Sequence, residues 1–477
     1  MFAAFEWFTN NILWGLPLLL LCGGLGLYLT IGSGFFQFRA FGKIIKAPFS
    51  SESQDTKSAG KRLSSFEAVS VAIGGSVGVS NISGVGTAIA TGGPGALFWL
   101  WIAALLGMMT KMAEATLAVH YRSTAPDGEH FGGPTYYMEK GLGKEKGWGI
   151  WKPLAIIFGL GIFMTFFITL QNYTTSEAIG STFNLPYWIP GLVLVLCIYA
   201  IILGGLKKVG SIASYLVPIM CVFYIGCVIV TLIMNASEIP NALAMVFKGA
   251  FTTQAAAGGF AGATMIAALR TGFARAVYSN EAGWGTSPMI HATANVNHPI
   301  KQGFMGGFEV FMDTIVVCTA TGLLVITTGY WNSGITGAEL TLTALEANIG
   351  SFARIAISLS IFFFALTTAT GWYTYYLVLL NHAFKEGPTK KLILKIYNAT
   401  DPIFGYIFTL ITVFGGGTPA EIWVFADFSS AIPTFVNCFA LLVLSGRFFE
   451  LLKDYKARYM GIGQVDPNFA VFYEDKK

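Results

Sequence analysis

Long apolar stretches alternate with short polar segments along the whole chain. Each stretch has about 17 residues or more, the length that a helix needs to cross the hydrocarbon core of a bilayer. The pattern therefore predicts eleven membrane-spanning helices. They are Ile12–Gly32, Ser64–Thr91, Gly95–Val119, Pro153–Thr182, Tyr187–Leu203, Ile212–Met234, Ala255–Ala294, Gly303–Thr327, Phe352–Leu380, Leu392–Phe414 and Ile422–Leu452.

Composition supports an all-α polytopic membrane protein. Hydrophobic residues make up 54% of the 477 residues and charged residues only 11%. A soluble protein of this length carries about twice that share of charge. The polar segments are too short for a separate catalytic domain. The first residues, MFAAFEWFTN, lack a basic region, so we expect a retained helix here and not a cleaved signal.

The placement of basic residues predicts the orientation. With the N-terminus outside and the C-terminus in the cytoplasm, only Lys248 and Arg354 of the 29 basic residues fall at the outer side. Cytoplasmic loops are enriched in Lys and Arg, so this orientation is favoured. The residues on the inner side are Lys43, Lys46, Lys57, Lys61, Arg62, Lys140, Lys144, Lys146, Lys207, Lys208, Lys385, Lys390, Lys391, Lys453, Lys456 and Arg458.

A glycine-rich octet occurs twice. SNISGVGT (Ser80–Thr87) and SNEAGWGT (Ser279–Thr286) share five of eight residues. Without the first span, ten helices divide into five plus five, and each octet falls in the first helix of a set. Five is odd, so the second set enters the membrane inverted. A competing register pairs GGSVG (Gly74–Gly78) with GGFAG (Gly258–Gly262).

This division predicts five parts. An extra N-terminal helix (1–33) and a cytoplasmic linker (34–62) precede the first five-helix repeat (63–235). The second repeat (236–455) includes the outer segments Asn241–Gln254 and Gly337–Gly350, which lie over the surface as lids or pack as interface helices. A cytoplasmic tail (456–477) follows.

Each octet predicts a broken helix. Glycine costs a helix about 1 kcal/mol relative to alanine, and broken backbone at membrane depth occurs only where it is buried in protein or lines a cavity. Freed carbonyls there can bind a cation, and the N-terminus of the next half-helix can hold an anion. The alternative is close packing of glycines between helices, at Gly84, Gly86, Gly92 and Gly93 above all.

Two long motifs resemble a known family. GGPGALFWLWIAALLG (Gly92–Gly107) resembles the signature of the alanine/glycine:cation symporter family (sodium:alanine symporters), and GFARAVY with SNEAGWG resembles its other landmark. Leu100 stands where that signature usually has methionine, and Ala276 where the family usually has glycine. The resemblance covers essentially the whole chain. It implies a leucine-transporter-like fold of ten helices in two inverted repeats.

The resemblance also implies a sodium site. GGSVGVSN (Gly74–Asn81) is similar to the first broken helix of the leucine-transporter group. By that similarity, the carbonyls of Gly74 and Val77 and the hydroxyls of Thr367 and Thr368 would bind Na⁺. Neutral oxygens suit this hard cation. The alternative for the threonines is hydrogen bonding back to their own helix.

The substrate is expected at the same break. Amides of the half-helix near Asn81, with the Asn81 side chain, would hold a carboxylate, and Gln171 could accept from an ammonium group. Phe273, expected at the second break, and Trp372, after the threonines, would cap a small side chain. Interhelical hydrogen bonding of Gln171 and ordinary packing of the two aromatics remain the alternatives. The predicted substrate-binding residues are Ser80, Asn81, Ser83, Gly84, Gln171, Phe273 and Trp372.

Intramembrane charges need partners or a function. Asp313 could pair with Arg275, which is expected near the second break, or serve coupling. Glu281 could cap the second half-helix, and Lys111 and Glu114 are expected to pair near the inner interface. We interpret the six cysteines as small, buried hydrophobic residues. They are Cys22, Cys197, Cys221, Cys227, Cys318 and Cys438.

These observations predict a secondary transporter, not an enzyme: sodium-coupled symport of a small neutral amino acid, alanine or glycine, across the plasma membrane by alternating access. Sodium is the coupling ion, no cofactor is expected, lipid surrounds the protein, and no nucleic acid is a partner. The oligomeric state stays open. A proton-coupled transporter or exchanger of the same fold, with Asp313 as the titrating group, is the alternative. A channel or receptor fits less well, since no repeated pore ring or sensory domain is visible.

Overall fold

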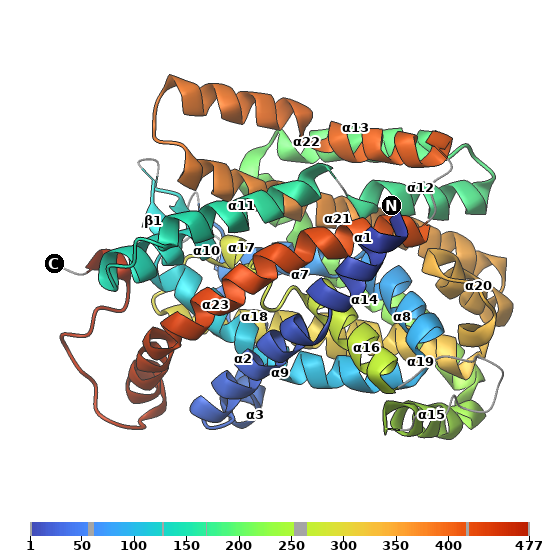
Figure 1. The fold of residues 1–477 in the computed structure, drawn as a ribbon, viewed down its shortest axis with the longest axis horizontal. Coiled ribbons are helices and arrows are strands. Elements are labelled where there is room, and N and C mark those ends of the chain that lie inside the picture. Colours follow the sequence, from blue (N-terminus) through green and yellow to red (C-terminus); the bar gives the residue numbers. More distant parts are fainter. Residues whose placement is uncertain are drawn as a thin grey trace.

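The structure is a computed structural model that describes residues 2–55, 62–125, 128–167, 169–251, 265–415 and 419–475. It is built almost wholly from helices (Figure 1). The helices are α1 (Phe2–Phe8), α2 (Leu16–Gly32), α3 (Phe36–Arg39), α4 (Phe41–Lys46), α5 (Ser51–Gln54), α7 (Ser65–Ser76), α8 (Val85–Gly92), α9 (Gly95–His120), α10 (Pro134–Tyr137), α11 (Trp151–Phe167), α12 (Leu170–Phe183), α13 (Trp188–Ile202), α14 (Gly205–Met234), α15 (Ile239–Phe251), α16 (Met265–Asn280), α17 (Pro288–His291), α18 (Pro299–Val310), α19 (Thr319–Thr327), α20 (Gly337–Ile349), α21 (Ser351–Ala383), α22 (Pro388–Gly415) and α23 (Pro419–Met460).

Short segments of other kinds join these helices. Strands β1 (Ser123–Thr124) and β2 (His130–Phe131) form a small antiparallel pair. Wider π-helical turns lie at Thr9–Leu13, Ser80–Gly84, Met138–Glu145 and Phe311–Cys318, and single 3₁₀ turns at Ala47–Phe49, Ala236–Glu238, Tyr330–Asn332 and Tyr473–Asp475.

The all-helical membrane architecture is confirmed. In the described parts of the chain, seven helices or helix pairs are long and apolar enough to cross a membrane, and eight if the bent pair α7–α8 is one span. Each predicted span overlaps at least one helix, but α13 and the described part of α16 are too short for this criterion, and α22 does not meet it either. The number of eleven therefore stays a prediction.

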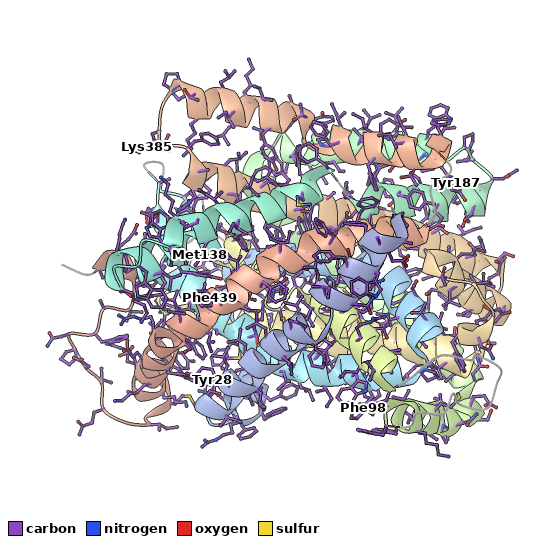
Figure 2. The ribbon with its side chains drawn as sticks, in the orientation of Figure 1. Tyr28, Phe98, Met138, Tyr187, Lys385 and Phe439 are labelled. Atoms are coloured by element: carbon purple, nitrogen blue, oxygen red, sulfur yellow. The ribbon has the colours of Figure 1, made fainter. Side chains whose placement is uncertain are left out.

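The outer faces of the peripheral helices are apolar. Large side chains stand on the outside of the ribbon (Figure 2), and Val222 of α14 and Ile411 of α22 are 72% and 65% exposed. Helices α13 and α22 lie side by side along one edge (Figure 1). Such a surface is stable only against hydrocarbon, in agreement with a multi-pass membrane protein.

Helix α9 lies at the centre because glycines let its neighbours approach. A β-carbon on Gly272 of α16 would lie 2.3 Å from the Ala96 carbonyl oxygen, and one on Gly303 of α18 would lie 2.5 Å from the Thr116 hydroxyl. Backbones can meet so closely only where side chains are small. Helix α16, which precedes the second break, and α18, which follows α17, are thereby packed against α9.

The predicted outer segments form helices α15 and α20. Helix α20 lies against the first broken helix: the Thr341 hydroxyl donates to the Ile82 carbonyl at 3.0 Å, and the Gly337 amide donates to the Thr87 hydroxyl at 2.9 Å. Its buried Leu342 and Leu345 join the main core. Helix α20 is therefore a packed part of the helical body.

Candidate functional site

The first broken helix has its interruption where the glycine pattern predicts it. Helix α7 ends at Ser76, Val77 is extended, and the chain resumes at Ser80 after a bend of 45°. The Asn81 side-chain oxygen accepts a 2.8 Å hydrogen bond from the Gly78 amide. One of the backbone groups freed by the break is thus satisfied by a side chain of the next turn.

Glycines bring this break against α21. A β-carbon on Gly75 would lie 2.6 Å from the Tyr375 hydroxyl, and one on Gly78 would lie 2.6 Å from the Thr368 hydroxyl. Real β-carbons do not approach other atoms so closely, so only glycine fits at either position. In the resulting contact the Thr368 hydroxyl donates a 2.8 Å hydrogen bond to the Gly74 carbonyl.

The predicted sodium ligands lie together in part. A β-carbon on Gly74 would be 3.1 Å from the Thr367 β-carbon, so both threonines are near this carbonyl. The Thr367 hydroxyl donates to carbonyls of its own helix, at Phe363 and Phe364. This is the alternative to sodium binding that the sequence leaves open for the threonines. Val77 is buried in the extended turn. Hydroxyl and carbonyl oxygens of this kind are chemically suited to Na⁺.

The second break lies at residues 281–287, between α16 and α17. Glu281, Gly283 and Gly285 have φ values of +55°, +92° and +89°. Positive φ costs glycine little, which explains why the octet carries glycines here. Phe273 and Arg275, expected at the break, lie inside the continuous helix α16. The half-helix expected before the break and the competing GGFAG motif fall largely or wholly in 252–264, outside the described residues.

A buried lysine forms hydrogen bonds with the turn at the second break. The Lys111 ammonium, fully buried, donates to the Glu281 carbonyl at 2.9 Å and to the Ser287 hydroxyl at 2.6 Å. It lies 3.7 Å from carboxylate oxygens of both Glu114 and Glu309. The expected Lys111–Glu114 pair exists, and both side chains are fully buried in the protein.

The Asn437 amide on α23 completes this cluster. It donates to Glu114 at 2.6 Å and to the Gly283 carbonyl at 2.8 Å. The Glu281 carboxylate accepts from the Thr286 hydroxyl at 2.5 Å, within its own turn. Glu281 therefore closes the turn of the second break.

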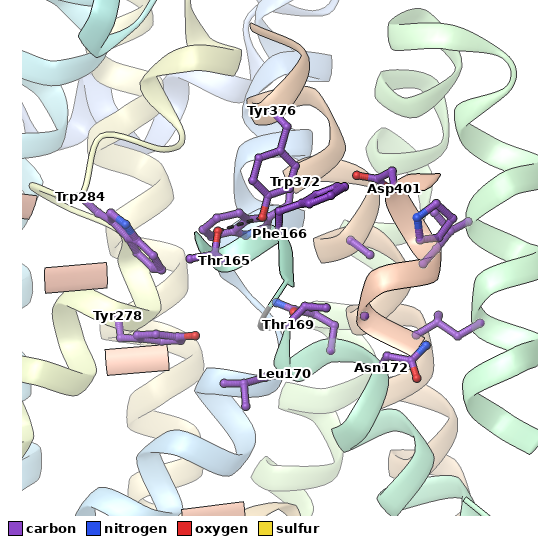
Figure 3. A pocket seen from close by; sticks show the side chains of 16 residues that line it. Thr165, Phe166, Thr169, Leu170, Asn172, Tyr278, Trp284, Trp372, Tyr376 and Asp401 are labelled. Atoms are coloured by element: carbon purple, nitrogen blue, oxygen red, sulfur yellow. Dashed lines mark hydrogen bonds between the residues drawn. The ribbon is translucent and has the colours of Figure 1, made fainter. Parts of the chain in front are cut away.

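The two breaks meet at an internal cavity. Its inner part, about 20 Å³, is lined by Gly75, Gly78 and Ser80 from the first break and by Glu281 and Trp284 from the second. Its larger part, about 60 Å³, shares five residues with the inner part and extends to α22 (Figure 3). The shared residues are Leu170, Gln171, Tyr278, Trp284 and Trp372.

Three predicted substrate residues, Ser80, Gln171 and Trp372, line this cavity together. Thr368, a predicted sodium ligand, lines it as well. The edge of Trp372 packs against Trp284 with ring centroids 5.2 Å apart. Gln171 follows a short interruption between α11 and α12, where Thr169 is extended and its hydroxyl hydrogen-bonds to the Gln171 side chain.

The other four predicted substrate residues lie elsewhere. The buried Asn81 amide donates to the Asp313 carboxylate at 2.7 Å, and its oxygen is taken by Gly78. Ser83 and Gly84 are buried in the turn that faces α20. Phe273 lines a separate small cavity beside the N-terminal helix, near Gly23.

The possible pairing of Arg275 with Asp313 is wrong. Arg275 forms its ion pair with Asp427 of α23. Asp313 is held instead by Asn81, by the Ser279 hydroxyl at 2.8 Å and by the Thr314 hydroxyl at 2.6 Å. Sequence spacing could not reveal Asp427, because α23 comes into contact with α16 only in the folded chain.

Sequence reasoning missed several cavity residues. Trp284 and Tyr278 come from the second octet and the helix before it, and Asp401 comes from α22. The signals were available: a tryptophan inside the repeated octet, and an aspartate before a proline in an apolar span.

An apolar helical body in which two interrupted helices meet at an internal cavity is the architecture of a secondary membrane transporter. The chain matches the sodium:alanine symporter family over residues 2–469 and belongs to that family. It is a transporter and not an enzyme.

Relatives extend over nearly the whole chain. The sodium/alanine symporter AgcS of Methanococcus maripaludis is 36% identical over 92% of this chain and 94% of its own. The putative sodium/proton-dependent alanine carrier protein YrbD of Bacillus subtilis is 34% identical over 94% and 91%, and the probable sodium/glutamine symporter GlnT of the same organism is 34% identical over 98% and 92%.

A solved structure shares the fold. The Eremococcus coleocola manganese transporter aligns with a TM-score of 0.50 and 12% identity, over 85% of this chain and 81% of that one.

Proposed function

We propose that this protein carries a small neutral amino acid, alanine or glycine, into the cell together with sodium by alternating access. The observation that carries the proposal is the cavity formed jointly by the two helix breaks, with Gly78 and Ser80 on one side and Trp284 on the other. Opposed half-helices supply carbonyl oxygens for a cation and amides for a carboxylate at one place.

We place the sodium ion between α7 and α21. The Gly74 carbonyl and the Thr368 hydroxyl are already in direct contact at 2.8 Å, and Thr367 lies beside them. With the Val77 carbonyl, they would supply four neutral oxygens. AgcS, named a sodium/alanine symporter, supports sodium as the coupling ion.

The size of the cavity favours a small substrate. Its inner part is only about 20 Å³ and is closed by the Trp284 and Trp372 rings. GlnT, a relative named for glutamine, makes a longer side chain the competing choice. The larger part of the cavity, toward α22, is where such a side chain would extend.

Alternating access requires that the cavity open in turn to each side of the membrane. We infer that the ten predicted spans after the first form two inverted repeats of five spans each in the plasma membrane, with the parts 63–235 and 236–455 each contributing one break. The N-terminus would lie outside and the C-terminus in the cytoplasm, as the basic residues indicate. The two repeats would rock about the central cavity.

Proton coupling is the second candidate, since the relative YrbD is named sodium/proton-dependent. Asp313 would carry the proton, because its carboxylate joins the first break, through Asn81, to α16, through Ser279. Loss of its charge would weaken both contacts.

Uptake of labelled alanine into proteoliposomes tests the proposal. We expect uptake under an inward sodium gradient, and its loss when potassium replaces sodium. Uptake that is independent of sodium but driven by an inward proton gradient would favour proton coupling at Asp313. A parallel assay with labelled glutamine decides between the two substrate sizes.

A further inference from the structure

The larger part of the cavity ends at a carboxylate. It extends from Trp284 and Trp372 to Asp401, Pro402 and Gly405 of α22 (Figure 3). Asp401 lies in the middle of a predicted span, where a charged side chain is costly and needs a partner. Pro402 lacks an amide hydrogen, so the helix is locally weakened beside it.

Asp401 has no cationic partner in the described parts of the chain. The Lys, Arg and His ion pairs found there involve other carboxylates. The Tyr397 hydroxyl, one turn earlier, lies within hydrogen-bond reach of Asp401 but carries no charge, and its single proton has a second acceptor in the Tyr373 carbonyl, 2.7 Å away. Among the described residues, an ionised Asp401 is thus left without a cation, and a cationic group bound in the cavity would supply one.

The cavity walls favour an organic ammonium over a metal ion. Phe166, Tyr278, Trp372 and Tyr376 present aromatic rings around the space, and such rings attract ammonium groups. A bare sodium ion needs several free oxygen ligands in one shell. Here the Thr165 and Tyr376 hydroxyls hydrogen-bond to each other, and the Thr169 hydroxyl hydrogen-bonds to the Gln171 side chain.

A donor lies across the cavity from Asp401. The Trp284 indole N–H is buried, and no hydrogen-bond partner for it exists among the described residues. In Figure 3, Trp284 and Asp401 lie on opposite sides of the Trp372 and Tyr376 rings. The walls thus supply an acceptor for an ammonium group and a donor for a carboxylate.

We propose that Asp401 binds the ammonium group of the transported amino acid at a second site in the cavity, beside α22 and apart from the central site at the two breaks. This inference rests on the proposed function, since it assumes an amino-acid substrate. The substrate would occupy this site on its way to or from the breaks, because Leu170, Gln171 and Trp372 wall both parts of the cavity.

The test compares wild type, Asp401→Asn and Asp401→Glu in proteoliposomes under a sodium gradient. Thr400→Ala is the matched control, because its hydroxyl donates to its own helix, at Ile396, and does not line the cavity. Alaninol, which keeps the ammonium and methyl groups of alanine but lacks the carboxylate, is used as an inhibitor that needs only an ammonium site.

For Asp401→Asn we expect the KM for alanine and the inhibition constant of alaninol to rise about tenfold, the loss of one charge-assisted contact. The maximal rate and the half-saturating sodium concentration should stay near wild type, and Asp401→Glu should recover part of the affinity. Thr400→Ala should match wild type.

An unchanged KM and alaninol inhibition in Asp401→Asn would overturn the inference. So would a lower maximal rate at unchanged KM, which indicates a structural role, or a changed sodium dependence alone, which indicates a cation or proton site. If wild type itself shows no sodium-driven alanine uptake, the proposed function fails, and this inference fails with it.

Discussion

The hydroxyl of Thr368 donates a 2.8 Å hydrogen bond to the main-chain carbonyl of Gly74, joining α21 to the first broken helix. A substitution that keeps the shape of the side chain but removes the hydroxyl tests this contact. For Thr368→Val we expect the half-saturating sodium concentration to rise about tenfold, because one oxygen ligand is lost.

Thr367→Val provides the comparison for that variant. Its hydroxyl donates to carbonyls of its own helix, so we expect a smaller rise. Sodium titrations of alanine uptake measure both. A larger effect at Thr367 would contradict the assignment of Thr368 as the principal side-chain ligand.

The fit between Gly75 and Tyr375 predicts a rescue experiment. In Gly75→Ala the new β-carbon would meet the Tyr375 hydroxyl at 2.6 Å, and we expect a loss of about 1–3 kcal/mol of stability and reduced uptake. Removing the hydroxyl in Gly75→Ala/Tyr375→Phe should restore much of both. Thermal unfolding in detergent measures the first.

Gly226→Ala is the control for this pair. Among the described residues, no atom beyond the local helix backbone lies within 4 Å of the place that a β-carbon on Gly226 of α14 would take. We therefore expect no loss of stability in this variant. A double variant as unstable as Gly75→Ala alone would show that the hydroxyl is not the obstacle.

The Lys111 cluster predicts a strong asymmetry between single and double substitutions. Lys111→Met would leave Glu114 and Glu309 buried without their cation, at a cost of about 3–5 kcal/mol. Lys111→Met/Glu309→Gln removes both charges of one pair and should recover part of this loss. The midpoint of thermal unfolding is the readout.

Lys453→Met, at an exposed position of α23, is the control and should be neutral. Equal midpoints for the single and the double variant would show that Lys111 and Glu309 are not coupled.

His298, at the turn before α18, predicts a pH effect. Its ring accepts from the Ile300 amide at 3.1 Å and lies 3.2 Å from the Asp454 carboxylate. Burial lowers the pKa of His298 to about 4, although Asp454 acts in the opposite direction. The neutral ring is therefore favoured by folding, and its stabilisation is present above pH ~6.5 and lost as the pH falls toward 4.

Between pH 7.5 and 5 this loss amounts to about 1–2 kcal/mol. His298→Asn keeps an acceptor for the Ile300 amide but does not titrate, so its unfolding midpoint should fall less over this range. Identical pH profiles for the two proteins would exclude His298 as the source.

The helical architecture and the first break could be predicted from the sequence, because hydropathy and glycine spacing are local signals. The apolar runs predicted where the helices lie, and GGSVGVSN predicted the interruption at Val77. The position of the second break could not be predicted as well. Its octet was found, but Phe273 and Arg275 were placed at the break, whereas the positive-φ residues begin at Glu281.

Side-chain partners across the fold were the least predictable. Asn81 is a polar residue at a broken helix, and sequence alone cannot show that Asp313 occupies its amide. Likewise, nothing near Arg275 in the sequence indicates Asp427, 152 residues away. Ser80, Gln171 and Trp372, which were predicted to bind substrate, line one cavity in the structure, and their role stays a prediction. Asp401 was overlooked because its span otherwise resembles an ordinary hydrocarbon-facing helix.

The second break is held by a lysine that water cannot reach. Lys111 donates to both ends of this turn, and Asn437 of α23 donates to its Gly283 carbonyl. Unwinding the turn would therefore leave several buried charges without partners. The first break rests on the close fit of glycines, on the neutral hydrogen bond between Thr368 and Gly74 and on the contact of Asn81 with the Asp313 carboxylate, and no ion pair of the described residues involves it. We therefore expect the wall formed by α16 and α17 with α9 to move less than the wall formed by the first broken helix with α21 when the cavity opens.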